Sequence, residues 1–247
     1  MTDEQLRQYL SFYRDLGIKT VNRLTIPEPP QVESAAPLSE PPTARSVIPP
    51  LPGIHPSDDT LAKIREDMGD CKRCRLGEGR KKLVFGSGNE QARLVFVGEG
   101  PGADEDEQGL PFVGRAGQLL TQMIEGTARR EGIPLTRADV YICNVVKCRP
   151  PENRTPLPDE MGTCGQFLFR QLMALRPGAI CALGSTAAKA LLGTKQGVTV
   201  LRGNWHKWRD IPVMVTYHPS YLLRPYNQNA KKEAWEDLKK VLHYVYD

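Results

Sequence analysis

The sequence predicts an α/β fold in which a mostly parallel, buried sheet lies between layers of helices. Four short apolar runs lack polar alternation, as expected of strands that are covered on both faces. Segments with apolar residues at helical spacing separate these runs, and such alternation is typical of a parallel sheet. Polar residues follow each run, at the strand ends where ligands of such sheets bind.

The expected elements follow one another from residue 93 to residue 245. The strands are predicted at 93–97 (RLVFV), 140–146 (VYICNVV), 179–183 (AICAL) and 211–217 (IPVMVTY). The helices are predicted at about 114–131, 158–175, 185–192 and 228–245.

The N-terminal part of the chain has a different character. Residues 3–18 place Leu and Tyr on one helical face, and residues 27–56 hold ten of the 21 prolines. A segment so rich in proline is expected to be an extended linker. We therefore expect a helical extension at 1–25, a linker at 26–57 and a catalytic domain at 58–247.

The composition excludes several classes of protein. The 247 residues are 40% hydrophobic and 25% charged, as in soluble globular proteins, with a net charge of +4. The first residues have neither the basic start nor the apolar core of a signal peptide. No run of about 18 apolar residues predicts a membrane span. The cytoplasm is the expected compartment, where six cysteines are metal-bound or buried rather than paired.

A glycine-rich turn follows the first strand, in VGEGPGADEDEQGLPFVGRAG at 97–117. Its glycines fit a dinucleotide fingerprint, but the next predicted strand lies too far along the chain, and Pro101 removes an amide that would hold pyrophosphate. The acids at 104–107 also oppose a phosphate, although they favour a helix start. A nucleotide-dependent oxidoreductase is therefore disfavoured. Glu99, between two glycines at the strand end, is expected to face a ligand.

The cysteines predict a metal site. Cys71 and Cys74 form a C-x2-C pair, and fifteen residues separate Cys148 from Cys164. Four thiolates can hold zinc or a [4Fe–4S] cluster, and their spacing does not decide between them. The other two cysteines lie within predicted strands and are expected in the core.

Basic residues surround these cysteines in the sequence. A metal that fixed their loops together would create a surface for a phosphate backbone, whereas the alternative is ordinary solvated surface. The residues are Lys72, Arg73, Arg75, Arg80, Lys81, Lys82, Lys147, Arg149 and Arg154.

Four motifs, GEGPGADED, PFVGRAGQLL, NVVKCRPPENRTP and HPSYLLR, resemble those of the family 4 uracil-DNA glycosylases, the iron–sulfur type, and stand in that family's order. The resemblance covers roughly residues 61–246. It implies a three-layer α/β/α sandwich around a four-stranded parallel sheet. It also implies that the four cysteines of the two pairs hold one [4Fe–4S] cluster, with zinc as the less favoured occupant.

The implied activity is hydrolysis of the N-glycosidic bond of uracil that has been flipped out of single- or double-stranded DNA. The product is an abasic site without strand cleavage, because no lysine in the motifs is placed as a Schiff-base nucleophile. A monomer is expected. The alternative is a nucleic-acid-binding module that the metal holds together and that has no catalysis.

The resemblance also implies roles for single residues. Asn144 would read uracil, Phe112 would stack on it, and His218 would donate a hydrogen bond to its O2. Their alternatives are a strand-end cap, a core aromatic and a turn histidine. Glu99, with Glu105 or Asp106, would stabilise the cationic sugar and orient water. The base-contacting backbone would be that of Gly98, Gly100, Pro101 and Gly102.

DNA contacts are implied after His218. Leu222 or Leu223 would wedge into the gap left by the flipped base, and Arg224 would bind a phosphate; core packing is the alternative for the leucines. Further DNA contacts are expected from Arg115, Arg149 and Arg154.

Two departures from the family pattern matter. GEGPGADED has Gly100 where alanine is frequent, and Ala103 and Asp104 where glutamates are frequent, so the roles of the single acids stay open. No basic histidine-containing insert lies between residues 192 and 205, which disfavours the covalent uracil capture of a related branch. The helix at 3–18 is either a poorly ordered extension or a docking peptide for a replication or repair protein.

Overall fold

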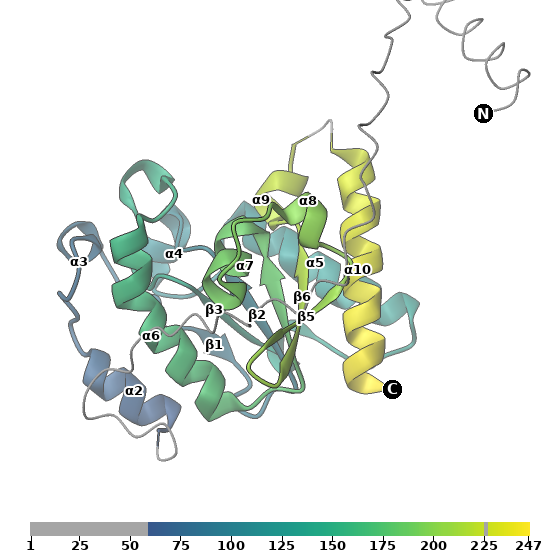
Figure 1. Ribbon diagram of the computed structural model, residues 1–247, viewed down its shortest axis with the longest axis horizontal. Helices are drawn as coiled ribbons and strands as arrows, with labels where there is room; N and C mark the ends of the chain where they lie inside the picture. Colours follow the sequence, from purple (N-terminus) through teal and green to yellow (C-terminus); the bar gives the residue numbers. More distant parts are fainter. Residues whose placement is uncertain (1–58, 225–226) are drawn as a thin grey trace, which may run out of the picture. The chain divides into compact units, whose positions relative to one another are not determined.

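The computed structural model describes residues 59–224 and 227–247, which form a sheet between two helical layers (Figure 1). The helix expected at 3–18 and the linker at 26–57 lie outside the described residues. The domain boundaries therefore remain a prediction.

Six strands form one mixed sheet in the order β1-β3-β2-β4-β6-β5. Its four central strands are parallel and lie within two residues of the predicted bounds. They are β3 (Tyr141–Asn144), β2 (Leu94–Gly98), β4 (Ala179–Leu183) and β6 (Ile211–Thr216). The predicted four-stranded parallel sheet is thus confirmed, with an antiparallel strand added at each edge: β1 (Ser87–Gly88) and β5 (Trp205–Trp208).

The apolar runs have no polar alternation because both faces of the sheet are covered. On β2, Val95 and Val97 contact the core on one face, while Leu94 and Phe96 contact the core on the other, and all four are fully buried. The first core also takes residues from α2 (Leu61–Met68), α6 (Pro158–Leu175) and α7 (Gly184–Leu192). The second takes residues from α5 (Arg115–Arg130) and α10 (Gln228–Tyr246).

Several shorter helices complete the described chain. One of them begins at the acidic turn, as the carboxylates at 104–107 favour. They are α3 (Leu76–Gly79), α4 (Ala103–Gln108), α8 (Val198–Leu201), α9 (Pro219–Leu222) and the 3-10 turns Arg137–Asp139 and Pro151–Asn153.

The helix α6 has the predicted bounds because its ends carry clear signals. Pro158 occupies the first turn, where its missing N–H costs nothing, and the Glu160 carboxylate accepts a hydrogen bond from the Leu157 amide at 2.7 Å. At the other end Arg176 adopts the left-handed conformation that closes a helix.

The Trp-rich segment LRGNWHKW supplies β5, which forms a hairpin with β6. Trp208 is buried and stacks on Phe169 at 5.5 Å between ring centroids. Trp205 is exposed and lies 4.6 Å from the ring of Tyr244. Among the described residues, no helix has the length and apolar character needed to cross a membrane.

Because both faces of the sheet are buried, the free energy of unfolding is expected to depend strongly on the volume of the side chains that fill them. Val215→Ala, at a fully buried position of β6, is expected to lower the free energy of unfolding by about 2–3 kcal/mol, since two methyl groups leave a cavity. Val200→Ala makes the same chemical change at a side chain that is 62% exposed, and is expected to change it by less than about 0.5 kcal/mol. Urea unfolding of both variants measures the difference; equal losses would contradict the described core.

Candidate active site

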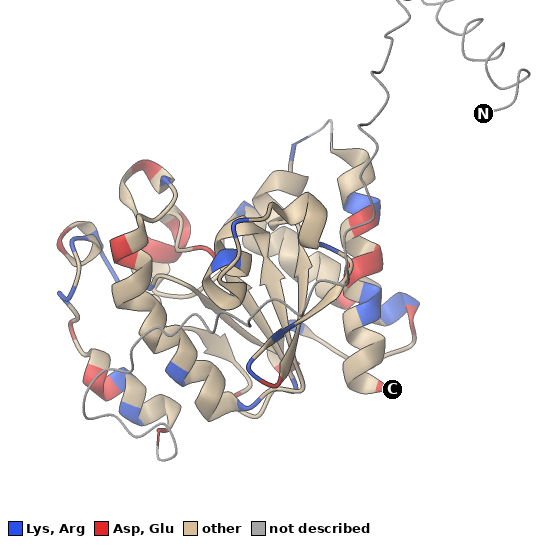
Figure 2. Cartoon of the chain, in the orientation of Figure 1, with Lys and Arg blue, Asp and Glu red and all other residues tan. Residues whose placement is uncertain are grey.

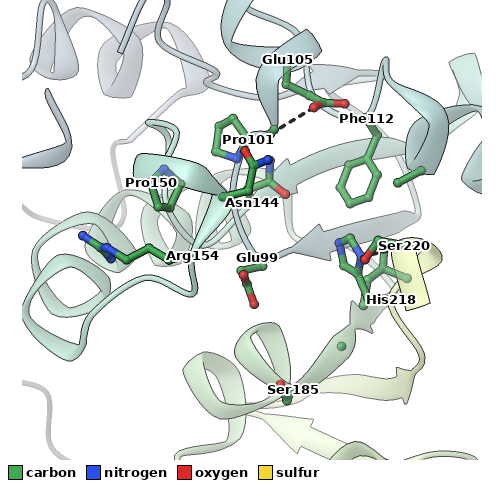
Figure 3. A pocket seen from close by; sticks show the side chains of 16 residues that line it. Glu99, Pro101, Glu105, Phe112, Asn144, Pro150, Arg154, Ser185, His218 and Ser220 are labelled. Carbon is green, nitrogen blue, oxygen red and sulfur yellow. Dashed lines mark hydrogen bonds between the residues drawn. The ribbon is translucent and has the colours of Figure 1, made fainter. Parts of the chain in front are cut away.

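A cavity of about 330 Å³ opens at the carboxyl ends of the parallel strands (Figure 3). Its size lies in the range of small-molecule sites. Every residue expected to contact the base lines it except Gly98, and the expected acids Glu99 and Glu105 line it as well. The full lining is Glu99, Gly100, Pro101, Gly102, Glu105, Phe112, Ala116, Asn144, Pro150, Asn153, Arg154, Leu183, Gly184, Ser185, His218 and Ser220.

Gly98 lies beneath the cavity and allows its floor to close. The β2–β3 register pairs Gly98 with Asn144, so the two strands end side by side. A Cβ at Gly98 would lie 2.4 Å from Asn144 Oδ1 and 2.5 Å from Phe112 Cζ. Glycine is therefore the residue that lets this carboxamide and this ring approach each other across the strand end.

Asn144 carries an unsatisfied acceptor into the cavity. Its side chain is 1% exposed, yet Oδ1 has no hydrogen-bond partner. Buried polar atoms are nearly always paired, so an unpaired amide oxygen in a cavity wall indicates a donor that arrives with a ligand. The carboxamide also provides two donors, which allows paired recognition of a planar polar edge.

Phe112 holds its ring over the cavity from a strained backbone. Its φ of +53° lies in the left-handed region, which an aromatic residue rarely adopts. The ring is buried and lies 5.6 Å from the ring of His218. Strain of this kind is characteristic of functional sites and persists only where neighbouring contacts impose it.

Glu105 supplies those contacts. Its carboxylate accepts hydrogen bonds from the amides of Gly102 (3.0 Å), Val113 (2.8 Å) and Gly114 (2.9 Å). One side chain thus joins the glycine-rich turn to the turn that follows Phe112. With both oxygens occupied, Glu105 is built to hold the cavity wall.

Of the other acids, Glu99 faces the cavity and Asp106 does not. Glu99 accepts a hydrogen bond from the hydroxyl of Thr186 and lies between the ends of β2 and α7 (Figure 3). Asp106 is buried outside the lining and accepts from the amide of Lys81 at 3.0 Å. Glu99 is thus the acid whose carboxylate is left to meet a ligand.

His218 begins α9 and faces the cavity as a neutral ring. Its Nδ1 accepts a hydrogen bond from the Ser220 amide at 3.2 Å and lies 2.8 Å from the Ser220 hydroxyl. Because Nδ1 accepts from a backbone N–H, the ring proton lies on Nε2. Burial lowers the pKa of His218 to about 4, so the neutral form persists at physiological pH.

Several residues that line the cavity have no predicted role. Ser185 follows the end of β4, but a single serine there carries no chemical signal. Pro150, Asn153 and Ala116 come from loops and helix starts that approach only after folding.

The four cysteines of the two predicted pairs line a second, small cavity, together with Met68, Arg73, Leu83, Lys147, Thr163 and Phe167. Cys143 and Cys181 are instead fully buried in strands, as expected. Burial raises the pKa of Cys148, and it raises that of Cys164 to about 12. Three donors meet the sulfurs: Arg73 lies 4.0 Å from Cys71 Sγ, Arg80 lies 3.5 Å from Cys148 Sγ, and the Lys147 amide lies 3.2 Å from Cys164 Sγ.

Most of the basic residues near the cysteines are paired with acids or buried, so they are not free to bind phosphate as expected. Lys147 is 1% exposed, and Arg80 is bound between a backbone carbonyl and Asp70. Arg154 donates to both oxygens of the buried Glu160 at 2.7 and 2.8 Å. Figure 2 shows acidic residues on α4 and at the start of α6, among the bases. Further ion pairs are Lys72–Asp70, Arg73–Asp67, Arg75–Asp159 and Lys81–Glu107.

Leu222, one of the two leucines expected to act as the wedge, is buried instead. Leu222 is 1% exposed and packs with Ala230 and Ala234 in a small core. Leu223 is half-buried and Arg224 is exposed at the end of the same short helix. The buried leucine follows from the turn of α9, which directs one leucine inward and leaves the next at the surface.

Comparison with known proteins agrees with this geometry. Residues 85–239 match the family model of the uracil DNA glycosylase superfamily. A type-4 uracil-DNA glycosylase from Thermotoga maritima is 44% identical over 78% of this chain and 98% of its own length. One from Sulfurisphaera tokodaii is 43% identical over 74% and 84%, respectively. A type-5 uracil-DNA glycosylase from Pyrobaculum aerophilum is 32% identical over 63% and 71%.

The pKa values of two histidines are expected to shift in opposite directions from the ordinary value of 6.5. Burial lowers the pKa of His218 to about 4, whereas hydrogen bonds to Glu131 and Asp247 raise the pKa of His243. In the unfolded chain His218 becomes protonated as the pH falls below about 6.5, whereas in the folded protein it stays neutral until about pH 4. The free energy of unfolding is therefore expected to decrease as the pH falls through this range. Histidine ring NMR shifts, assigned with His218→Gln and His243→Gln, measure both values. A His218 midpoint at or above 6.5 would contradict the neutral ring described for the folded protein.

Proposed function

Since this chain belongs to the uracil-DNA glycosylase superfamily, and within it to the type-4 group, we propose that it hydrolyses the N-glycosidic bond of uracil in DNA and leaves an abasic site. The observation that carries the proposal is the unpaired Oδ1 of Asn144 in the cavity wall. The enzyme acts on a base that has left the duplex, because the cavity admits a base edge and not a helix.

Base recognition rests on Asn144 and Phe112. The Asn144 oxygen accepts from the ring N–H of uracil while its amide group donates to the adjacent carbonyl. Cytosine presents a ring acceptor and an exocyclic donor at these positions, so it leaves the buried amide unpaired. Phe112 stacks on the base face, held in place by the Glu105 carboxylate.

Bond cleavage separates charge, and the cavity supplies a partner for each half. Negative charge grows on uracil O2, where the Nε2–H of neutral His218 donates as in an oxyanion hole. Positive charge grows on the sugar, where the Glu99 carboxylate stabilises it and orients the attacking water. The described residues that line the cavity include no lysine, which supports hydrolysis without strand cleavage.

The surroundings of the cavity support contacts to DNA. We propose Leu223 as the wedge and Arg115, Arg149 and Arg224 as phosphate contacts. Arg115 and Arg224 are exposed, and Arg149 is half-buried. Arg154 contributes less as a phosphate ligand, because Glu160 already binds its guanidinium. We propose that the enzyme acts as a monomer.

We also propose that Cys71, Cys74, Cys148 and Cys164 hold one [4Fe–4S] cluster. The four thiols line one cavity, and buried donors beside Cys148 and Cys164 suit charged sulfurs. Four thiolates can hold either zinc or a [4Fe–4S] cluster, and the resemblance of the cysteine motifs to those of the iron–sulfur type favours the cluster. The cluster would fix α3, the end of β3 and α6 to one another.

The excision assay uses labelled DNA with one uracil, followed by alkali to cut at abasic sites. Wild-type protein is expected to give cleavage only after alkali. Asn144→Ala is expected to retain the fold and to lose about 100- to 1,000-fold in rate, since it removes a preorganised donor and acceptor.

Asn204→Ala is the matched control, because Asn204 is exposed on a turn outside the cavity. Its rate is expected to equal that of the wild type. Cleavage without alkali would refute the monofunctional assignment, and an unchanged rate in Asn144→Ala would refute the pocket.

The cluster proposal predicts a distinction between two buried cysteines. Cys148→Ser is expected to lose iron, visible absorbance and thermal stability together. Cys181→Ala changes a buried cysteine of β4 outside the cysteine cavity and is expected to keep its iron. Iron analysis and thermal unfolding measure both. Full iron in Cys148→Ser, or loss from both variants, would contradict the ligand assignment.

A further inference from the structure

Lys147 is buried between the two cavities and has no part in the reaction described above. Its side chain is 1% exposed, although long cations are seldom buried without an acidic partner. Its Nζ donates to the backbone oxygen of Asn144 at 2.7 Å and to Gln171 Oε1 at 2.6 Å. Both acceptors are neutral, so the amino group is held by geometry rather than by an ion pair.

The chain around Lys147 is fixed at several points. Its amide donates to Cys164 Sγ at 3.2 Å, and its carbonyl accepts from the Val84 amide at 2.8 Å. Gln171 is fixed in turn, since its Nε2 donates to the Phe85 carbonyl at 3.0 Å. The amino group is therefore anchored on α6 and on the segment before β1.

The amino group of Lys147 binds β3 at Asn144, the residue proposed to recognise the base. Regular β3 pairing ends at Asn144, so the Asn144 carbonyl lies where the ladder with β2 gives way to the following turn. The Nζ bond therefore restrains the backbone from which the Asn144 carboxamide projects. Either protonation state of the amine has the two N–H groups that these bonds need.

We propose that Lys147 is a positioning residue that sets the backbone of Asn144, and with it the angle at which the carboxamide meets the base. This inference rests on the proposed uracil excision. A displacement of about 1 Å at such a site costs on the order of 100-fold in rate, so a bond behind the strand has a measurable effect on catalysis.

The test is a double-mutant cycle in the holoprotein, with iron content measured for each variant. Lys147→Met keeps the length of the side chain and removes both bonds, and kcat is expected to fall roughly 10- to 100-fold with iron retained. In an Asn144→Ala background the same change is expected to alter the single-turnover rate by less than about 2-fold, because the positioned group is gone.

Thr216→Val is the matched control, since it removes a buried hydrogen bond, from the Thr216 hydroxyl to Asp237 at 2.8 Å, that involves neither Lys147 nor Asn144. It is expected to lower thermal stability and to change kcat by less than about 2-fold. Should Lys147→Met not fold with its iron, Lys147→Gln is judged by the same cycle.

Two outcomes would overturn the role of Lys147: additive losses in the cycle, or an equal loss of kcat in Thr216→Val. Each would show that the residue acts through general stability. Absence of uracil excision by the wild type would instead overturn the proposed function itself, so the two failures are distinguishable.

Discussion

The pairing of β2 with β3 is the constraint on which the rest of the site depends. Parallel register places Gly98 beside Asn144, and the missing side chain of Gly98 leaves the space that the Asn144 carboxamide and the Phe112 ring occupy. Everything else in the cavity is arranged around that floor. The Glu105 carboxylate holds one wall, and α9 presents His218 from the end of β6 on another side.

Much of this fold was predictable because its signals are local. Strand composition placed the four parallel strands within two residues, and Pro158 marked the start of α6. The convergence of Glu99, Asn144 and His218 was also predictable, since parallel strands bring their carboxyl ends to one edge. The edge strand β1 was not predicted, because the pairing of a two-residue strand is set by its partner.

The residues whose environment differs from the prediction share one physical cause. Their burial and their charge pairing depend on residues that are far away in the sequence. Lys147 lies among surface-like bases in the sequence, but Gln171 and the Asn144 backbone hold it inside. Arg154 is bound by Glu160, and Leu222 is drawn into a core built by α10. For Glu105, composition indicated an acid at the pocket, whereas its three amide bonds depend on a loop that returns only in the folded chain.

The unpaired Oδ1 of Asn144 also has an evolutionary consequence. A buried acceptor without a donor costs roughly 1–3 kcal/mol, so selection for stability alone would replace it with an apolar side chain. The amide persists at this strand end only while ligand binding is under selection. In a homologue that no longer needs to bind the ligand, an apolar side chain that fills the cavity would increase stability. Substitution of Asn144 is therefore expected to be the first change in such a homologue. The unpaired amide of Asn144 therefore indicates selection for a bound ligand.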